Sequence, residues 1–463
     1  MSTESATGQD ARPSDSAAGI LNRAYRWVTV GMLAMILLAA FEALAVTTVM
    51  PTISRELDGE SLYALAFSGP LAVGVVGMVV AGNWSDRAGP KRALFAAVFS
   101  FAGGLLVAGL ATSMPMLVAG RLVSGLGGGG LTVALYVLVA RVYPLALHPK
   151  IFAAFAAAWV IPSLVGPLVA GAVAQTVGWR WVFLGVVVLV LLAMFMVVPV
   201  MRGFPTAQNG VPWKAAPILW SIVAAVAVLG ASLVGQLSGV AVWLVSGAAI
   251  VVTVWALRPL LPRGSLTLAR GLPSVIVLRG LMSAAYFSSD TYLPYLFTSQ
   301  YDFSPTMAGL SLSVSGVSWA AASWAMTRFA AGWSDTASLR LGVGLVLVAV
   351  LSALGCSILG LPAAVVIVGW VFAGAGMGVV YPRLSVATLR LSTPSNQGFN
   401  SSALAISDST VAALALALTA GVFATFGDAS VLGFTGCFVL SGILGLAALV
   451  VTRRVRPATT TGA

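Results

Sequence analysis

Long apolar runs, interrupted by charges, prolines and glycine clusters, repeat along almost the whole chain. A helix of about 20 apolar residues crosses the hydrocarbon core of a membrane, which is roughly 30 Å thick. The pattern therefore predicts about fourteen membrane-spanning helices. The expected spans lie near residues 27–50, 62–83, 92–112, 115–140, 151–174, 181–200, 215–235, 240–257, 272–298, 306–330, 341–360, 363–389, 400–426 and 430–452.

The composition strengthens this prediction, because 59% of the residues are apolar, 8% are charged and the mean hydropathy is +1.01. A soluble chain carries roughly a quarter charged residues, so a soluble enzyme is excluded. The net charge of +11 comes from basic residues scattered singly between apolar runs, which excludes a nucleic-acid-binding surface. The cysteines, Cys356 and Cys437, lie far apart inside apolar runs and predict neither a metal site nor a disulfide framework. The single histidine, His148, is expected to be solvated.

Basic residues collect in alternate loops, which the insertion rule for Lys and Arg assigns to the cytoplasm. These loops hold Arg23, Arg26, Arg87, Lys91, Arg92, Arg141, Lys150, Arg202, Lys214, Arg258, Arg263, Arg270, Arg340, Arg390, Arg453, Arg454 and Arg456. The opposite loops hold acidic residues, namely Glu56, Asp58, Glu60, Asp302 and Asp428. Both termini are therefore expected in the cytoplasm. Residues 1–26, without a hydrophobic signal segment, and residues 453–463 are expected to be cytoplasmic tails.

An internal repeat relates the two halves of the chain. Adding 249 to the residue number carries Trp84, Ser85, Asp86, Gly125, Gly127, Gly129 and Arg141 onto Trp333, Ser334, Asp335, Gly374, Gly376, Gly378 and Arg390. The repeat predicts an all-α integral membrane protein with two six-helix bundles, residues 27–200 and 272–452. A linker of residues 201–271 with two extra transmembrane helices joins them. Parallel repeats of this kind place a binding site between the halves, as in an alternating-access transporter.

Four motifs occur in order along the first bundle. They are centred on Glu42 in the first span, on Gly82, Asp86, Arg87, Gly89 and Arg92 in the loop after the second, on Arg121 in the fourth, and on Gly166, Pro167 and Gly171 in the fifth. Together they resemble the motifs of the major facilitator superfamily. The first-span motif resembles that of its fourteen-span drug:proton antiporter subgroup, and the fifth-span motif resembles the antiporter motif of drug exporters. The resemblance implies the major facilitator fold and favours export.

The same resemblance implies a role for the loop after the second span. In the family this loop forms a charge relay that latches the two halves in the outward-open state, and the matching residues here are Asp86, Arg87 and Arg92. Asp335 occupies the repeat-equivalent place. Because Thr336 follows it where an arginine is usual, its latch is expected to be the weaker one.

Three of the thirteen acidic residues fall within predicted spans, namely Glu42, Asp290 and Asp408. An ionised carboxylate inside a membrane is costly, so such a residue faces a cavity, pairs with a cation or carries a proton. Each is a candidate for proton coupling or substrate binding, and the alternatives are a static salt bridge or a polar packing contact. Arg121 joins these candidates because the resemblance places it near Glu42. Pro294 is expected to loosen the helix near Asp290.

Three further arginines lie near or within predicted spans. Arg279 and Arg328 are expected to extend towards the cytoplasmic surface, with their aliphatic stems in the membrane. For Arg383 both the surface and the interior remain open.

These observations lead to one main hypothesis and two alternatives. The main hypothesis is a secondary transporter of the bacterial cytoplasmic membrane that exports hydrophobic or amphipathic small molecules, drugs among them, in exchange for protons. One alternative keeps the fold and exports a lipid or biosynthetic product; the other is a non-transporting receptor or assembly factor. No nucleophile, base and orienting group recur at useful spacings, so an enzyme is not expected. We expect a monomer without a cofactor, with the proton as coupling ion.

Overall fold

The computed structural model describes residues 19–23, 25–144, 147–201, 213–234, 237, 239–329, 332–393, 396–426 and 430–456. The expected tails at residues 1–18 and 457–463, together with Arg202 and Asp428, lie outside the described residues.

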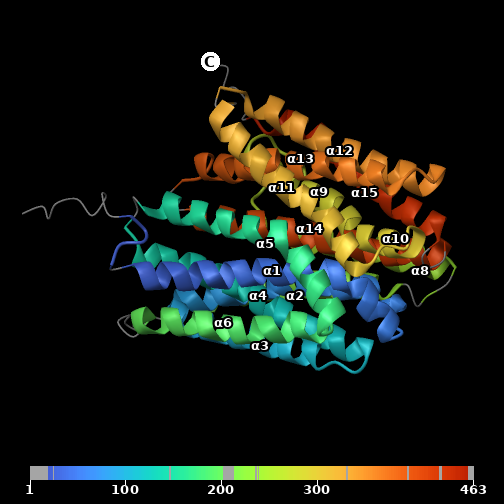
Figure 1. The fold of residues 1–463 in the computed structure, drawn as a ribbon. Helices are drawn as coiled ribbons and strands as arrows, with labels where there is room; N and C mark the ends of the chain where they lie inside the picture. Colours follow the sequence, from blue (N-terminus) through green and yellow to red (C-terminus); the bar gives the residue numbers. More distant parts are fainter. Residues whose placement is uncertain are drawn as a thin grey trace, which may run out of the picture.

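The described residues form helices joined by short turns (Figure 1). The α-helices are α1 (Arg26–Glu56), α2 (Tyr63–Ala88), α3 (Pro90–Gly109), α4 (Met114–Val142), α5 (His148–Thr176), α6 (Arg180–Met201), α7 (Ala215–Ser232), α8 (Val240–Leu257), α9 (Leu272–Asp290), α10 (Leu293–Gln300), α11 (Pro305–Phe329), α12 (Asp335–Leu359), α13 (Ala363–Arg390), α14 (Gln397–Phe426) and α15 (Val431–Val451). Two short 3₁₀ helices, η2 (Glu60–Leu62) and η5 (Thr452–Arg454), flank α2 and α15.

Thirteen stretches of the described residues are long and apolar enough to cross a membrane, and one of them contains both α9 and α10. Helix α11 has 25 residues, which is also sufficient for a span, but its serines lower its hydropathy. The all-α membrane fold predicted from the sequence is therefore confirmed.

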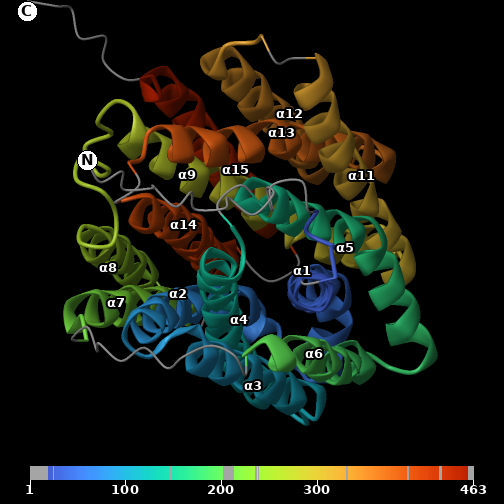
Figure 2. The ribbon, with the colours of Figure 1, turned by 90° about the vertical axis from the view of Figure 1, so that its left-hand side faces the viewer.

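Two groups of helices lie side by side, and their internal packing follows the repeat (Figure 2). In the first bundle α1 packs on α5 and α6, and α4 packs on α2 and α3; in the second, α9 packs on α14 and α15, and α13 packs on α11 and α12. The bundles meet where α5 contacts α11 and where α2 contacts α14. Such an arrangement fits the two bundles with two additional helices that were predicted from the sequence.

The two ends of the helices differ in charge. We call the end that carries Arg26, Arg258 and Arg390 the basic end, and the end that carries Glu56, Glu60 and Asp302 the acidic end. Helix α1 runs from the basic end on the left of Figure 1 to the acidic end on the right.

Glycines set the close approach of neighbouring helices inside each bundle. A Cβ atom at Gly129 of α4 would lie 1.9 Å from the backbone oxygen of Gly74 in α2. The repeat-equivalent Gly378 of α13 stands in the same relation to α11, where a Cβ atom would lie 2.3 Å from the backbone oxygen of Trp319. Close packing therefore accounts for the glycine spacing that the two halves share.

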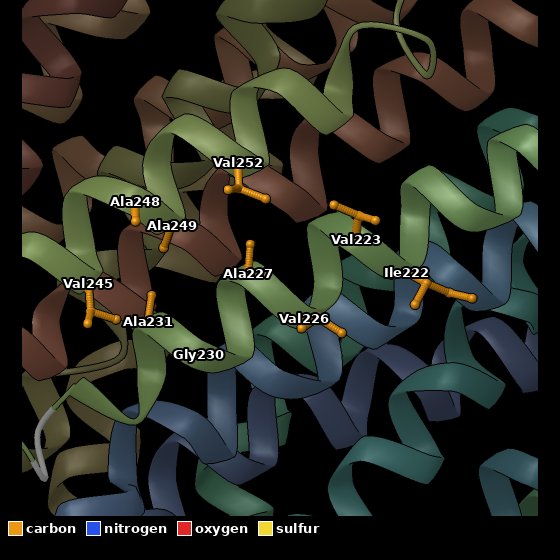
Figure 3. Close-up of a pocket in the computed structure, with 10 residues that line it drawn as sticks. All are labelled: Ile222, Val223, Val226, Ala227, Gly230, Ala231, Val245, Ala248, Ala249 and Val252. Carbon is orange, nitrogen blue, oxygen red and sulfur yellow. The ribbon is translucent and has the colours of Figure 1, made fainter.

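Helices α7 and α8 lie at the periphery, beside α2 and α14 (Figure 2). Helix α7 is held to α2 partly by a hydrogen bond of 2.6 Å between the hydroxyls of Ser232 and Ser68. Between α7 and α8 lies an apolar groove of about 380 Å³, lined by Ile222, Val223, Val226, Ala227, Gly230, Ala231, Val245, Ala248, Ala249 and Val252 (Figure 3). The groove contains no charged side chain, so it suits a lipid-facing surface.

Candidate functional site

Glu42 and Arg121 form a buried ion pair inside the first bundle. Glu42 of α1 is 6% exposed and Arg121 of α4 is 5% exposed. The Arg121 Nη1 atom donates to Glu42 Oε1, and its Nε atom donates to the backbone oxygen of Ala66 at 3.2 Å. The family resemblance predicted that Arg121 lies near Glu42, and the structure places the two side chains in direct contact. Each charge compensates the other, so neither is buried in the bundle without a counter-charge.

Asp290 lies in the second bundle and has a different kind of partner. Its side chain is buried at the end of α9, where the indole Nε1 of Trp370 in α13 donates to its Oδ1 atom at 2.8 Å. The hydroxyl of Tyr286, one turn earlier on α9, also interacts with the carboxylate. Both partners are neutral, so the charge of an ionised Asp290 is solvated only by dipoles.

The helix breaks immediately after Asp290. Sequence analysis predicted one span over residues 272–298, and one membrane-length stretch, Leu272–Gln300, covers it. Within this stretch a short turn at Thr291 and Tyr292 separates α9 from α10. Pro294 has no N–H group to donate to the backbone oxygen of Asp290, which explains the end of α9. The loosening predicted near Asp290 is thus observed as a two-residue interruption, in which Thr291 and Tyr292 keep helical backbone angles.

Asp408 of α14 lies in a polar cluster with Arg279 of α9 and Tyr381 of α13. The Arg279 Nε atom donates to Asp408 Oδ1 at 2.9 Å, and the Tyr381 hydroxyl donates to the same oxygen at 2.9 Å. The Arg279 guanidinium carbon lies 3.3 Å from the centre of the Tyr381 ring. The side chains of Arg279 and Asp408 remain 15% and 24% exposed.

The expected position of Arg279 at the cytoplasmic surface is therefore wrong. The side chain turns inward because Asp408 supplies a counter-charge and Tyr381 supplies an aromatic face on which the guanidinium stacks. Arg328 is exposed near the end of α11, as expected.

Tyr136 of α4 is a residue of the first bundle that interacts with this cluster. Sequence analysis did not select it as a site residue. It is 40% exposed, and its hydroxyl interacts electrostatically with Arg279 and Asp408. Its ring packs edge-on against Phe152 of α5, with ring centres 5.3 Å apart. Aromatic residues are too frequent in this chain for the sequence to distinguish Tyr136 from residues that face lipid.

The loop between α2 and α3 is a tight turn at Gly89. Gly89 joins the helices with φ of +80°, and Gly82 is half-buried on α2. Asp86, Arg87 and Arg92 are exposed, and no ion pair joins them to another described residue.

The repeat-equivalent Asp335 is instead the paired carboxylate. It accepts hydrogen bonds from Arg383 Nη1 at 3.3 Å and from Arg390, both on α13. The expectation of a weaker contact at Asp335 thus does not describe this conformation. The first bundle has Ala134 at the position equivalent to Arg383, so Asp86 lacks that partner.

The antiporter-like motif of α5 faces the second bundle. A Cβ atom at Gly171 would lie 2.8 Å from the Cα atom of Thr306 in α11, and a Cβ atom at Gly309 would lie 2.5 Å from the backbone oxygen of Pro167. A Cβ atom at Gly166 would lie 3.6 Å from the ring of Phe41 in α1. Two of the three motif residues therefore form the contact between the bundles.

A tyrosine cluster joins the bundles at the acidic end. The hydroxyl of Tyr63, at the start of α2, donates to the backbone oxygen of Thr291 at 3.1 Å. Its ring lies 5.6 Å from that of Tyr292 and 5.2 Å from that of Tyr295, measured between centres. We call Tyr63, Tyr292 and Tyr295 the tyrosine gate. No pattern in the sequence indicates this cluster, because it depends on contact between segments that are far apart in the chain.

Comparison with known families decides the assignment of the chain. A sequence profile described as Major Facilitator Superfamily matches residues 32–364. The chain belongs to the Major Facilitator Superfamily. This major facilitator protein is therefore a member of a transporter family.

Two relatives are fungal transporters. The chain is 34% identical over 184 residues to the MFS efflux transporter aclA of Aspergillus oryzae, covering 40% of this chain and 33% of the relative. It is 34% identical over 145 residues to the acurin A biosynthesis cluster MFS-type transporter of Aspergillus aculeatus, covering 31% of this chain and 26% of the relative. The matched part of this major facilitator protein thus spans a third or less of these relatives' length.

A solved structure shares the fold at low sequence identity. The crystal structure of a POT family transporter in complex with 5-aminolevulinic acid superposes with a TM-score of 0.69 and 14% identity. The superposition covers 93% of this chain and 96% of that chain. It shows that this major facilitator protein has the same overall fold as that transporter.

Proposed function

We propose that the protein is a proton-coupled exporter of hydrophobic or amphipathic small molecules, of the fourteen-span drug:proton antiporter type. The observation that carries the proposal is a buried carboxylate on the first helix of each bundle, Glu42 and Asp290. Buried membrane carboxylates are typical of proton pathways in transporters. Export is supported by the antiporter-like motif at the contact between α5 and α11, and by the relative named as an efflux transporter.

The cluster around Asp408 supports an amphipathic substrate. Arg279 and Asp408 cancel each other's charge, and the side chains of both remain partly exposed. Tyr136 and Phe152, which are 40% and 37% exposed, add aromatic surface from the first bundle. A site with balanced charges and aromatic faces suits a molecule with a large apolar part and a polar group.

A second candidate function is export of a biosynthetic product. It is favoured by the relative that is named for a biosynthesis cluster. The same proton coupling would serve it, so only the substrate distinguishes the two. A non-transporting receptor or assembly factor is the outcome if no transport is found.

The proposal includes the setting of the protein. We place it as a monomer in the cytoplasmic membrane of a bacterium, with both termini in the cytoplasm, the proton as coupling ion, and no cofactor or nucleic-acid partner. We further propose that residues 27–200 and 272–452 move relative to each other during alternating access, and that residues 201–271 link them.

Uptake of ethidium into inverted membrane vesicles tests the proposal. We expect ethidium uptake that depends on an acidic vesicle interior and that stops when a protonophore removes the pH gradient. Vesicles without the protein are the control. If a panel of lipophilic dyes shows no uptake above that control, multidrug export is contradicted and a dedicated product becomes the better hypothesis.

A further inference from the structure

The two buried carboxylates occupy related places in the repeat. The offset of 249 carries Arg121 onto Trp370, and it carries Glu42 onto Thr291, the residue next to Asp290. Each carboxylate lies on the first helix of its bundle, and each is bound by a side chain of the fourth helix, α4 or α13. The same structural position thus holds a carboxylate with a cation in one half and a carboxylate with an indole in the other.

This difference in partners changes the energetic cost of protonating Glu42 and Asp290. Protonating Glu42 would leave the buried guanidinium of Arg121 without a counter-charge, and an uncompensated buried charge is strongly unfavourable. Protonating Asp290 leaves no such charge, because Trp370 and Tyr286 are neutral donors. Only the second site can exchange a proton without isolating a cation in the membrane.

The surroundings of Asp290 support this distinction. The titratable groups in this region are Tyr286 of α9, Tyr292 between α9 and α10, Tyr63 of α2 and Cys437 of α15. The polar groups are Trp370 of α13, Ser315 of α11, Thr419 of α14 and Ser441 of α15. The other charged residues of α9 and of the helices packed against it are Arg279, Asp408, Arg383, Arg390, Asp335, Arg340, Arg453 and Arg454. Arg279 and Asp408 pair with each other, and the remaining residues lie towards the basic end, away from Asp290. No cation forms an ion pair with Asp290 among the described residues.

Asp290 is also joined to the contact between the bundles. It is the last residue of α9, and the next residue, Thr291, accepts the hydrogen bond from Tyr63 of the first bundle. Pro294 leaves the backbone oxygen of Asp290 without its helical donor, so the segment between α9 and α10 can shift. A change in the hydrogen bonds of the Asp290 side chain therefore acts next to the tyrosine gate.

We propose that Asp290 is the proton-exchanging carboxylate, that Trp370 is its positioning residue, and that Glu42 and Arg121 form a permanent ion pair that holds the first bundle together. The inference rests on the proposed proton coupling. In this scheme a proton taken up by Asp290 neutralises the acceptor of the Trp370 N–H group and loosens the segment at Thr291. Release of the proton restores the charge and the hydrogen bond.

Infrared difference spectra of the purified full-length protein, recorded as the pH is lowered, test the inference without a substrate. We expect a band from a protonated, buried carboxyl group that is lost in Asp290→Asn. The band is expected to persist in Glu42→Leu/Arg121→Met, which removes the ion pair as a unit, and in Asp302→Asn, whose side chain is exposed at the acidic end. Persistence of the band in Asp290→Asn would overturn the inference, as would its loss in the folded double variant or a wild type without any such band.

Variants at Trp370 test its positioning role. Trp370→Phe keeps an aromatic ring but removes the donor, so the ionised carboxylate loses stabilisation and the band should persist to higher pH. Trp370→Arg should abolish the band by supplying a counter-charge like that of Arg121. An unchanged pH profile in Trp370→Phe, with the band still assigned to Asp290, would show that Trp370 has only a packing role.

Ethidium exchange separates this inference from the proposed function. Asp290→Asn should lose uptake driven by the pH gradient but keep exchange of labelled for unlabelled ethidium, because alternating access continues with the neutral side chain. If Asp290→Asn retains gradient-driven uptake, the inference fails while proton-coupled transport stands. If the wild type takes up no substrate but the infrared band still depends on Asp290, proton exchange stands and the exporter proposal fails.

Discussion

At the scale of single residues, the partner of each membrane carboxylate decides what it can do. Glu42 has a buried arginine, Asp408 has a partly exposed arginine and a tyrosine, and Asp290 has an indole. The sequence identified all three carboxylates because a charge inside an apolar run is conspicuous. It did not identify Trp370 as a partner, since tryptophan in a membrane span usually serves packing or the lipid surface.

Removing one member of the Glu42–Arg121 pair should destabilise the protein. A buried charge left without its partner costs about 3–5 kcal/mol, whereas replacing both partners by apolar side chains costs little. We therefore expect Glu42→Gln to lower the free energy of unfolding by about 3–5 kcal/mol and Glu42→Leu/Arg121→Met to recover most of that loss. Unfolding in mixed micelles, followed by circular dichroism, measures both. Equal losses in the two variants would contradict a pairing role for Glu42.

At the scale of elements, helices were predicted well and their interruptions less well. The apolar runs fixed the presence of α9, but the break before α10 needed the tertiary environment as well as Pro294. Prolines also lie inside α1, α2 and α5 without ending them. Neighbouring helices decide whether the chain continues after a proline, because they can satisfy the freed backbone oxygen.

Adjacent glycines in α4 allow a matched test of helix packing. A Cβ atom at Gly129 would collide with the backbone of α2, whereas one at Gly128 would lie 3.6 Å from the Phe101 ring, an ordinary contact. We expect Gly129→Ala to lower the melting temperature, with a cost of about 1–3 kcal/mol. Gly128→Ala should leave it unchanged or slightly raised, because alanine favours a helix. Thermal unfolding in detergent measures both, and equal effects would contradict the close approach of α2 and α4.

At the scale of the whole molecule, the two bundles touch along α5 and α11, along α2 and α14, and at the tyrosine gate. A Cβ atom at Gly316 of α11 would lie 2.3 Å from the backbone oxygen of Ser163 in α5. The contact between α5 and α11 is made by small residues, and the contact between α2 and α14 by apolar residues such as Ala72 and Ala413. Such an interface suits two bodies that rock against each other during transport.

A disulfide across this interface should stop transport reversibly. Ser163→Cys/Gly316→Cys places two thiols on facing helices, where the Cβ atoms would lie 2.9 Å apart. That is closer than the usual spacing of about 3.5–4.5 Å, and a Cβ atom at Gly316 would also lie 2.3 Å from the Ser163 backbone oxygen, so the helices must separate to admit the bond. The reduced double variant must therefore first show exchange equal to that of the wild type. We expect oxidation to abolish ethidium exchange and reduction to restore it. The two single-cysteine variants are the controls, and full exchange in the cross-linked protein would show that the bundles do not separate here.

The sequence by itself determined the all-α membrane fold, the repeated halves and the three membrane carboxylates. Each of these follows from local hydropathy or from spacing within the chain. Only the tertiary structure decided that Arg279 turns inward to Asp408, that Asp335 rather than Asp86 is paired, and that Trp370 binds Asp290. These outcomes depend on which side chains meet between helices that are far apart in sequence. A counter-charge, a hydrogen-bond donor or a stacking ring on a neighbouring helix then decides where a side chain lies, and the residue type alone does not predict it.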